Sequence, residues 1–456
     1  MKNGRNEVDR RNDGAVTNER SAAWRPSLLA LAGFALTVPA TGAAQEAGYG
    51  PPAPKDVAAE ASFAAIPAGI DDQLALAARR MLADYPSLEA ARRTVRAGDY
   101  EVEAANWLRY PSVDVSLSTS DERLGLARPA ITIFQPIWAG GRISAGIARG
   151  NASREIARAR LDEVAFDLLL RLAQSYYEIG RTARLVEIYR QSVTEHRRLV
   201  ESMQRRVAQE VSPRTDLELA LSRTAQTEQE LALLETQEGI ARARFAELSG
   251  LPGMEIAPPA YDEPSHHAVS DYALERAVAC NPTVRRFDAE IALAEAELRL
   301  SKAAILPQVG AQYVHDRFGG EQIGLAVRAT TDGGLSALSL SQAAGARRDA
   351  SRFAADTAQR EVREAVALDL IENRAARARI ASSALAADSS LNVTNSYLRQ
   401  FVAGRRTWLD VMNSVREAVA ARAALVEAET SAMSSSARIH LGACEWVPGP
   451  AEGSGE

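Results

Sequence analysis

The chain has 456 residues, a formal net charge of −6 and two cysteines, Cys280 and Cys444. This length exceeds that of one ordinary domain, and the acidic balance argues against a surface that binds nucleic acid. Two cysteines exclude a disulfide-dense scaffold and a zinc site built from cysteines.

The N-terminus has the pattern of a secretory signal. Arg25 precedes an apolar run over residues 28–38, and small residues follow that run. Such a run is too short to span a bilayer as a helix, so we expect a signal peptide over residues 1–44, cleaved after Ala44. A disordered linker is expected over residues 45–70, and we expect the mature chain to be exported.

The next segment, residues 71–252, predicts helices arranged around one unusually long helix. No proline interrupts the stretch from Gly141 to Gln209, where apolar residues recur every seven positions: Leu172, Ile179, Val186, Val193, Val200 and Val207. A strict seven-residue repeat predicts a left-handed supercoil. At 1.5 Å per residue this helix is about 103 Å long, close to the summed lengths of the predicted helices Pro86–Tyr110 and Pro213–Gly250. One long helix can therefore lie beside two shorter helices stacked end to end.

Alternating runs predict four strands, at about 111–120, 130–138, 308–316 and 322–330. In the first run Val113, Val115 and Leu117 share one face, whereas Asp114 and Ser116 share the other. An apolar face opposite a small polar face fits a strand with lipid outside and water inside. Four strands cannot close a barrel, and lipid does not tolerate open edges, so several copies must combine. The alternative is a pair of soluble hairpins that cap a helical bundle.

The second half of the chain, residues 271–446, repeats the first. Residues 281–314 resemble residues 85–118, and each stretch has the same spacing between two prolines, Pro86 to Pro111 and Pro282 to Pro307. Long helical patterns follow again, at Leu335–Ala403 and Arg405–Cys444. We interpret this as one unit of about 195 residues used twice.

Two further segments flank the second half. A Pro-rich connector is expected over residues 253–270, with His266 and His267 in a solvated loop because no ligand-like spacing surrounds them. A flexible tail is expected over residues 447–456.

Two short motifs accompany the duplication: "QPIWAGGR" at residues 135–142 and "GRRTWLDVMN" at residues 404–413. Together with the repeated helix and strand, over about Ile70 to Trp446, they resemble the TolC family of outer-membrane channel proteins. The resemblance implies a mainly α membrane protein with long antiparallel coiled-coil helices that form a periplasmic α-barrel. It also implies four strands per chain that contribute to a trimeric transmembrane β-barrel of twelve strands.

The same resemblance implies partners and a location. The chain would form a homotrimer in the outer membrane, in contact with outer-membrane lipid, with most of its residues in the periplasm. A periplasmic adaptor (membrane fusion) protein and an inner-membrane ABC or proton-driven transporter would dock at the lower end. Neither catalysis nor a cofactor or metal is implied, and the energy would come from the partner.

The resemblance assigns roles to the two helix turns at the lower tips. Aligning Gly404 with Glu210 puts Asp410 opposite Asp216 and Leu409 opposite Thr215. By motif position, a periplasmic gate is implied at Arg406, Asp410, Thr215, Asp216, Phe401 and Asn413. Adaptor-docking tips are implied at Glu210, Val211, Ser212, Gly404, Arg405 and Trp408. Phe401 departs from a Tyr that is often found there, and Asn413 departs from an acidic residue.

Simpler interpretations of these residues stay open. Arg406 and Asp410 are spaced i, i+4 and could pair locally on one helix, which contributes about 0.3–0.5 kcal/mol. Trp408 could pack between the tip helices instead of contacting an adaptor. The predicted helix lengths place Cys280 and Cys444 at similar heights. We nevertheless expect two free thiols, because equal height does not bring Cα atoms within bonding reach.

Three functions are compared. The sequences of the two motifs resemble those of the branch of the family that serves type I secretion of a large protein such as an adhesin. The alternative on the same fold is the outer-membrane component of a multidrug or metal efflux pump. A remote alternative is a periplasmic coiled-coil protein that transports nothing, and the predicted strands argue against it.

Overall fold

A computed structural model describes residues 66–118, 128–266, 272–316, 320–329 and 336–447. All described elements belong to the compact unit Ala61–Glu456. The expected signal peptide, most of the expected linker and nearly all of the expected tail lie outside the described residues.

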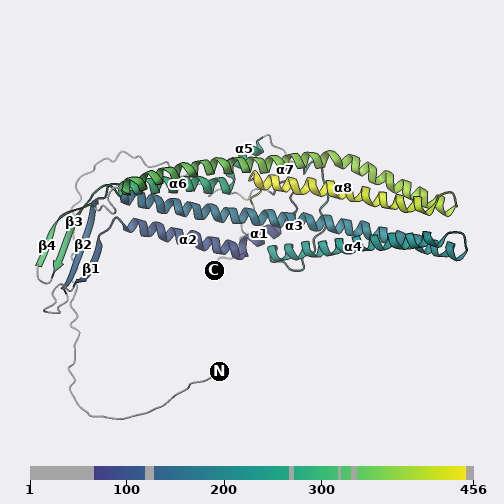
Figure 1. The fold of residues 1–456 in the computed structure, drawn as a ribbon, viewed down its shortest axis with the longest axis horizontal. Helices are drawn as coiled ribbons and strands as arrows, with labels where there is room; N and C mark the ends of the chain where they lie inside the picture. The colour runs from purple at the N-terminus through teal and green to yellow at the C-terminus, as the bar shows by residue number, and fades with distance from the viewer. Residues whose placement is uncertain (1–65, 119–127, 267–271, 317–319, 330–335, 448–456) are drawn as a thin grey trace, which may run out of the picture. The chain divides into compact units, whose positions relative to one another are not determined.

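The order of elements in the first half recurs in the second half (Figure 1). The first half contains α1 (Asp72–Asp84), α2 (Pro86–Trp107), β1 (Ser112–Ser118), β2 (Arg128–Trp138), α3 (Arg142–Ala208) and α4 (Arg214–Ser249). The second contains α5 (Ala273–Cys280), α6 (Pro282–Ala303), β3 (Gln308–Asp316), β4 (Gly320–Arg328), α7 (Ser336–Val402) and α8 (Trp408–Gly442). The helices α3 and α7 each have 67 residues, and α2 and α6 each have 22. These equal lengths accord with a unit used twice.

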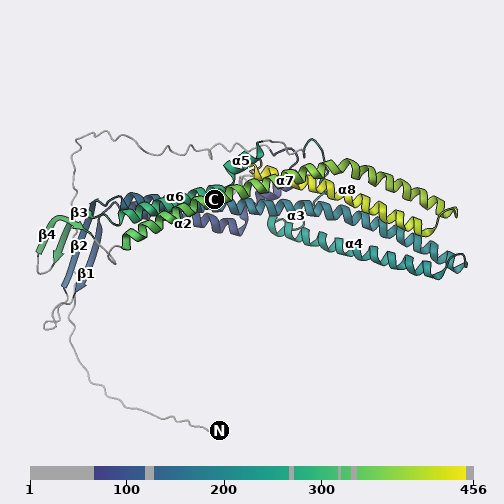
Figure 2. The ribbon, with the colours of Figure 1, turned by 45° about the horizontal axis from the view of Figure 1, so that its top comes forward.

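The long helix α3 packs against α2 and α4, which lie one after the other along it, and α7 packs in the same way against α6 and α8 (Figures 1 and 2). At 1.5 Å per residue, 67 residues span about 100 Å. The residues of α3 that recur every seven positions are buried from Leu172 to Val200, and Val207 packs at the edge of the tip core. Because α3 also contacts α6 and α8, it joins the two halves. The predicted arrangement of one long helix beside two shorter ones is confirmed.

The four predicted strands are present and form one antiparallel sheet in the order β1-β2-β3-β4. Val113 pairs with Ile133, which pairs with Tyr313, which in turn pairs with Ile323. This row and its neighbours give one face of exposed apolar side chains, including Ile323 at 84% and Leu325 at 76% exposure. The opposite face carries Ser112, Asp114, Thr132 and Gln312, as the alternation predicts. A register shift at Pro136/Trp138 kinks β2 where it approaches the helices.

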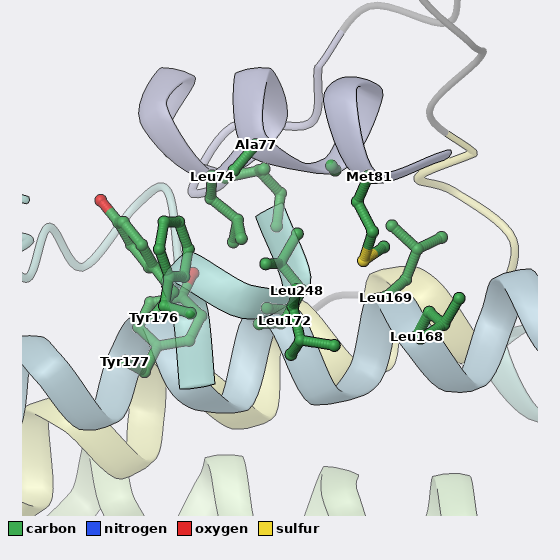
Figure 3. Close-up of a cluster of buried hydrophobic side chains, with 14 of the residues drawn as sticks. Leu74, Ala77, Met81, Leu168, Leu169, Leu172, Tyr176, Tyr177 and Leu248 are labelled. Carbon is green, nitrogen blue, oxygen red and sulfur yellow. The ribbon is translucent and has the colours of Figure 1, made fainter. Parts of the chain in front are cut away.

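The largest apolar core lies at the middle of the unit, where α1 covers the junction of α2 and α4 on α3. Figure 3 shows Leu74 and Met81 of α1 directed toward Leu172 and Tyr176 of α3, with Leu248 of α4 beside them. The side chain of Asp71 caps α1 by accepting a hydrogen bond from the Gln73 N–H at 2.8 Å. This short helix therefore closes the gap between two helices that are stacked end to end. No helix within the described ranges is long and apolar enough to cross a membrane.

The connector between the halves crosses this middle region, and one prediction about it is wrong. His266 is 6% exposed and its Nδ1 donates to the Asp262 carbonyl at 2.7 Å, so it does not lie in a solvated loop. The buried Asn373 of α7 donates from Nδ2 to the carbonyl oxygens of His266 at 3.4 Å and Ala432 at 2.9 Å. A buried histidine needs hydrogen-bond partners. The prediction rested on metal-ligand spacing alone, which does not reveal such partners. His267 lies outside the described residues.

The two cysteines also correct a prediction. They lie at the same height, as expected, but they form a disulfide, with the Cα atoms 6.4 Å apart. The disulfide joins the last residue of α5 to the turn that ends α8. An ion pair between Arg276 and Glu445, 3.1 Å from nitrogen to oxygen, lies beside it. Sequence spacing determined how far along the helices each cysteine lies. The distance between the two cysteines depended on how α5 packs against α7 and α8.

We expect no free thiols in the denatured, unreduced protein, and replacing both cysteines by serine should destabilise it by about 2–4 kcal/mol. The physical reason is that the disulfide closes a loop of 164 residues in the unfolded chain. Thiol titration and denaturant unfolding would measure both effects.

A matched control separates this effect from backbone strain. Cys444 has a left-handed backbone with φ of 53°, so Cys444→Gly in a Cys280→Ser chain should recover about 1 kcal/mol relative to the double serine variant. Two titratable thiols per unreduced chain would contradict the disulfide.

Candidate periplasmic gate

The two hairpin turns have matching geometry, which supports the alignment of Gly404 with Glu210. Five residues separate α3 from α4 and α7 from α8. Glu210 has φ of 60° and Gly404 has φ of 73°, and each stands at the second position after its helix. Matching backbone bonds close both turns: Glu210 N–H to Val207 O, Val211 N–H to Arg206 O, Gly404 N–H to Phe401 O and Arg405 N–H to Gln400 O, all at 2.8–3.0 Å. This is the Schellman pattern of helix ends.

The returning helices also begin in register. Pro213 caps α4 and Thr407 caps α8, so Asp216 and Asp410 both occupy the third helical position. Thr407 and Asp410 form a capping box, in which each side chain accepts from the other residue's backbone N–H. Carboxylates in this first turn are favoured by the free N–H groups and the helix dipole.

Arg406 is held on its own hairpin. Its Nη1 lies 3.9 Å from the Asp410 Oδ2, its Nε donates to the Gln400 Oε1 at 3.4 Å, and its guanidinium lies 4.4 Å from the Tyr397 ring centre. Both partners of the ion pair are about 40% exposed, and the distance is at the long end for an ion pair. The structure therefore brings Arg406 and Asp410 together, but only loosely.

The other gate residues of the first hairpin lie apart from this pair. Thr215 is exposed and Asp216 is half-buried on the first turn of α4. Within the described part of this chain, no ion pair reaches the Asp216 carboxylate. It is therefore available to a cation from another copy of the chain.

Phe401 and Trp408 belong to the apolar core of the tip instead of its surface. They are 4% and 8% exposed and pack with Met203, Ala220 and Val411. The Arg206 guanidinium lies 4.4 Å from the Phe401 ring centre and donates to the Phe401 carbonyl at 3.3 Å, which ties the α3 tip to the α7 tip. The position of Trp408 favours packing between the tip helices over an adaptor contact.

The exposed part of the tips is small and mostly polar. Glu210, Val211, Gly404 and Arg405 are exposed and Ser212 is half-buried. Asn413 is exposed and accepts a hydrogen bond from Arg416 at 3.4 Å.

A cavity of about 330 Å³ lies above the tips, between α3, α4 and α8, and the sequence reasoning missed it. Its lining includes Asn413, Leu409, Tyr189 and His196. Burial lowers the pKa of His196, whose Nδ1 donates to the Ser192 carbonyl at 2.8 Å, so the ring stays neutral at pH 7. Residues of three separate helices line this cavity, so the pattern of a single helix does not reveal it. Among the described residues, no group of three His, Cys, Asp or Glu side chains could hold a metal ion.

The matched turns predict opposite effects for two substitutions. Glu210→Gly should stabilise the first turn by about 1 kcal/mol, because glycine adopts a positive φ without steric cost. Gly404→Ala should destabilise the second turn by about 1–2 kcal/mol, although no neighbouring atom would touch the new Cβ.

Amide hydrogen exchange on peptides that cover each turn would measure the two changes. Each variant serves as the control for the other, because the unsubstituted turn should exchange at the wild-type rate. Faster exchange at the first turn in Glu210→Gly would show that the Glu210 side chain, and not its backbone, holds that turn.

Comparison with known proteins agrees with this geometry. Residues 77–251 match the family model described as "Outer membrane efflux protein". A comparison with curated protein sequences gives no match.

Several solved channels have the same fold. The outer membrane protein VceC from Vibrio cholerae is 16% identical, with a TM-score of 0.71 over 83% of this chain and 96% of its own. The Campylobacter jejuni CmeC outer membrane channel is 10% identical, with a TM-score of 0.72 over 82% of this chain and 86% of its own. CusC is 14% identical, with a TM-score of 0.70 over 84% and 94% of the two chains.

Members of this family are outer-membrane channels with a large periplasmic helical part, and they act as passive channels and not as enzymes. They are trimers that work with adaptor and inner-membrane transporter proteins. The family motifs, the element order and the paired tip turns all occur in this chain. Residues 77–251 therefore match the outer membrane efflux protein family, and the chain has the fold of TolC-like outer-membrane channels.

Proposed function

We propose that this chain is the trimeric exit duct of a tripartite export machine for type I secretion of a large protein. The four-stranded sheet carries this proposal. One of its faces is mainly apolar, with exposed large side chains on β1, β2 and β4, and the other is mainly polar. A sheet with these two faces suits a wall between lipid and a water-filled lumen.

The sheet edges explain why three copies are needed. β1 and β4 are the outer strands, and each has a partner on one side only among the described strands. Unpaired N–H and C=O groups are very unfavourable in lipid, so β4 of one copy must pair with β1 of the next. Three copies of four strands close a barrel of twelve.

The helices offer matching surfaces for subunit contacts. Large apolar side chains are exposed on α4 and α7, in the parts of the coil that have no partner within the chain. They are Leu221, Leu233 and Ile240 on α4 and Phe353, Leu368, Ile371 and Leu385 on α7. Apolar patches of this kind mark contact surfaces between proteins. In the trimer, α4 of one subunit would cover α7 of its neighbour.

Threefold symmetry gives the tip charges a gating role. Arg406 has only a loose pair on its own hairpin, and Asp216 is unpaired in the described chain, so the two can pair between neighbouring subunits with Thr215 as an acceptor. One exposed pair contributes about 0.5–1 kcal/mol. Three pairs contribute about 1.5–3 kcal/mol, a factor of roughly 10–100 in the ratio of closed to open channels. An adaptor docked on the tips at residues 210–212 and 404–405 can overcome that amount.

The cargo distinguishes two versions of this function. The sequences of the motifs at residues 135–142 and 404–413 favour type I secretion, with an ABC transporter as the inner-membrane partner. The description of the matching family model favours the second candidate, an efflux duct for drugs or metals with a proton-driven transporter.

Arg406→Ser and Asp216→Ala should each raise single-channel conductance in planar bilayers, and the double variant should add little to either single one. The reason is that both changes remove the same three intersubunit pairs. The matched control is Arg214→Ser, which removes another exposed tip arginine with a local partner 3.9 Å away, Glu218, and should leave conductance unchanged.

Chemical crosslinking in detergent should give a ladder that ends at three for every variant, which confirms that they are compared in the same assembly. If both single variants conduct like the wild type, the tip charges are only local helix pairs. A folded monomer in detergent would contradict the duct itself.

Deleting the gene should leave a large secreted protein inside the cell while drug sensitivity changes little. Mass spectrometry of the secreted proteins and growth inhibition by a drug panel measure the two outcomes. Broad hypersensitivity to drugs with normal secretion would favour the efflux function and reject type I secretion.

A further inference from the structure

The inner, polar face of the sheet carries an unusual pair of arginines where the strands meet the helices. Arg328 ends β4, and Arg142 is the first residue of α3. Gln308, the first residue of β3, stands opposite Arg328 in the sheet register. In the amide orientation that satisfies both groups, the Gln308 oxygen accepts from Arg142 Nη1 at 2.7 Å and Nε at 3.1 Å. Gln308 therefore bonds Arg142 and stands opposite Arg328 in the backbone register, so both arginines belong to this end of the sheet.

Arg328 is held in a fixed position on this face. Its guanidinium lies 4.0 Å from the Phe134 ring centre, and its Nη2 donates to the Gln312 Oε1 at 3.2 Å. Phe134 is 6% exposed although it belongs to the polar face. Gly310 makes this possible, because a Cβ there would lie 2.5 Å from the Phe134 ring. The sheet thus holds the Arg328 guanidinium in a specific position.

The side-chain partners of these two arginines are neutral, unlike those of the many described arginines that form ion pairs. Arginines elsewhere pair with carboxylates, for example Arg181 with Glu427 at 2.7 Å and Arg286 with Glu163 at 2.9 Å. Within the described residues, Arg142 and Arg328 form no ion pair. Their positive charges are fixed in place by glutamines and an aromatic ring but are not compensated.

Arg142 also breaks a local rule. The N-terminal turn of a helix carries partial positive charge, which makes a cation there unfavourable by about 0.3–1 kcal/mol. The first turn of α3 contains no acidic residue to offset it. Violations of local rules without a structural gain are found mainly at functional sites.

The other charged groups near this edge do not cancel the pair. On α6, Glu297 and Glu295 are engaged by Arg149 and Arg352, at 3.9 and 2.9 Å. On the inner face, Asp114 stands opposite Thr132, one register row beyond the Ser112–Phe134 pair.

Arg142 and Arg328 therefore place positive charge near the edge of the sheet that joins the helices.

We propose that Arg142 and Arg328 form an anion-selective ring at the base of the barrel, which favours anionic cargo or acidic stretches of a polypeptide. This inference rests on the proposed trimeric duct, in which the polar face lines the lumen. Three subunits place six guanidinium groups around the base of the barrel. A cluster of one sign in a confined channel raises the local concentration of counter-ions.

The test is the reversal potential in planar bilayers under a KCl gradient, with wild type and with Arg406→Ser channels. Arg142→Gln and Arg328→Gln should each lower the permeability ratio of chloride to potassium by about two- to fivefold. The change should be larger at 0.1 M than at 1 M salt, because the Debye length falls from about 10 Å to about 3 Å. Arg328→Lys keeps the charge and should retain most of the selectivity.

Arg80→Gln is the matched control, since Arg80 lies on α1 and pairs with Asp84 at 3.0 Å, and it should not change the ratio. Channels that conduct with an unchanged reversal potential in both glutamine variants would overturn the ring and leave the duct intact. Complete absence of channel activity in every variant, wild type included, would contradict the duct instead.

Discussion

The rest of the structure depends on the packing of α3, a helix of 67 residues whose apolar residues recur every seven positions from Leu172 to Val207. This stripe faces α2 and α4 on one side of the chain and reaches α6 and α8 on the other. An isolated helix of this composition gains little from helix propensity, so its stability comes from this tertiary packing. Because α3 runs from the sheet to the tip, it fixes the distance between the membrane wall and the periplasmic turns. Both candidate functional regions therefore lie at the two ends of one rigid element.

Contacts at the middle of the unit hold the long helices together. There α1 covers the joint between α2 and α4, the connector crosses α7 through the His266–Asn373 hydrogen bond, and the disulfide ties α5 to α8. The first contact is apolar, the second is a hydrogen bond and the third is covalent. Each connects elements that do not pair with each other in the coiled coil. The tips, by contrast, are held by a small core around Trp408 and by loose ion pairs. The contacts that hold the middle are therefore more extensive than those that hold the tip, which accords with the proposed gate at that end.

The two ends use arginine in different ways. At the tip, Arg406 has a weak partner on its own hairpin, so a modest change in geometry can exchange one carboxylate for another. At the base of the sheet, Arg328 is seated on Phe134 and Gln312, and nothing in the described chain neutralises it. A loosely paired charge suits a switch, whereas a fixed and uncompensated charge suits a filter. In the proposed duct, the same residue type would therefore serve gating or selectivity according to how rigidly it is held.

The sequence by itself determined the order and lengths of the six longer helices, the four strands and their two faces, and the positions of both tip turns. These features follow from local periodicity, from prolines at Pro86 and Pro282, and from the alignment of Glu210 with Gly404, all of which act over short stretches of chain. Lateral contacts were decided only by the tertiary structure. Each of the following depends on residues from different elements: the disulfide, the burial of His266 and Phe401, the contact of Arg142 with Gln308, and that of Arg328 with Phe134. Periodicity specifies which face a residue occupies and how far along the helix it lies, but the neighbour across that face depends on how separate helices and strands pack.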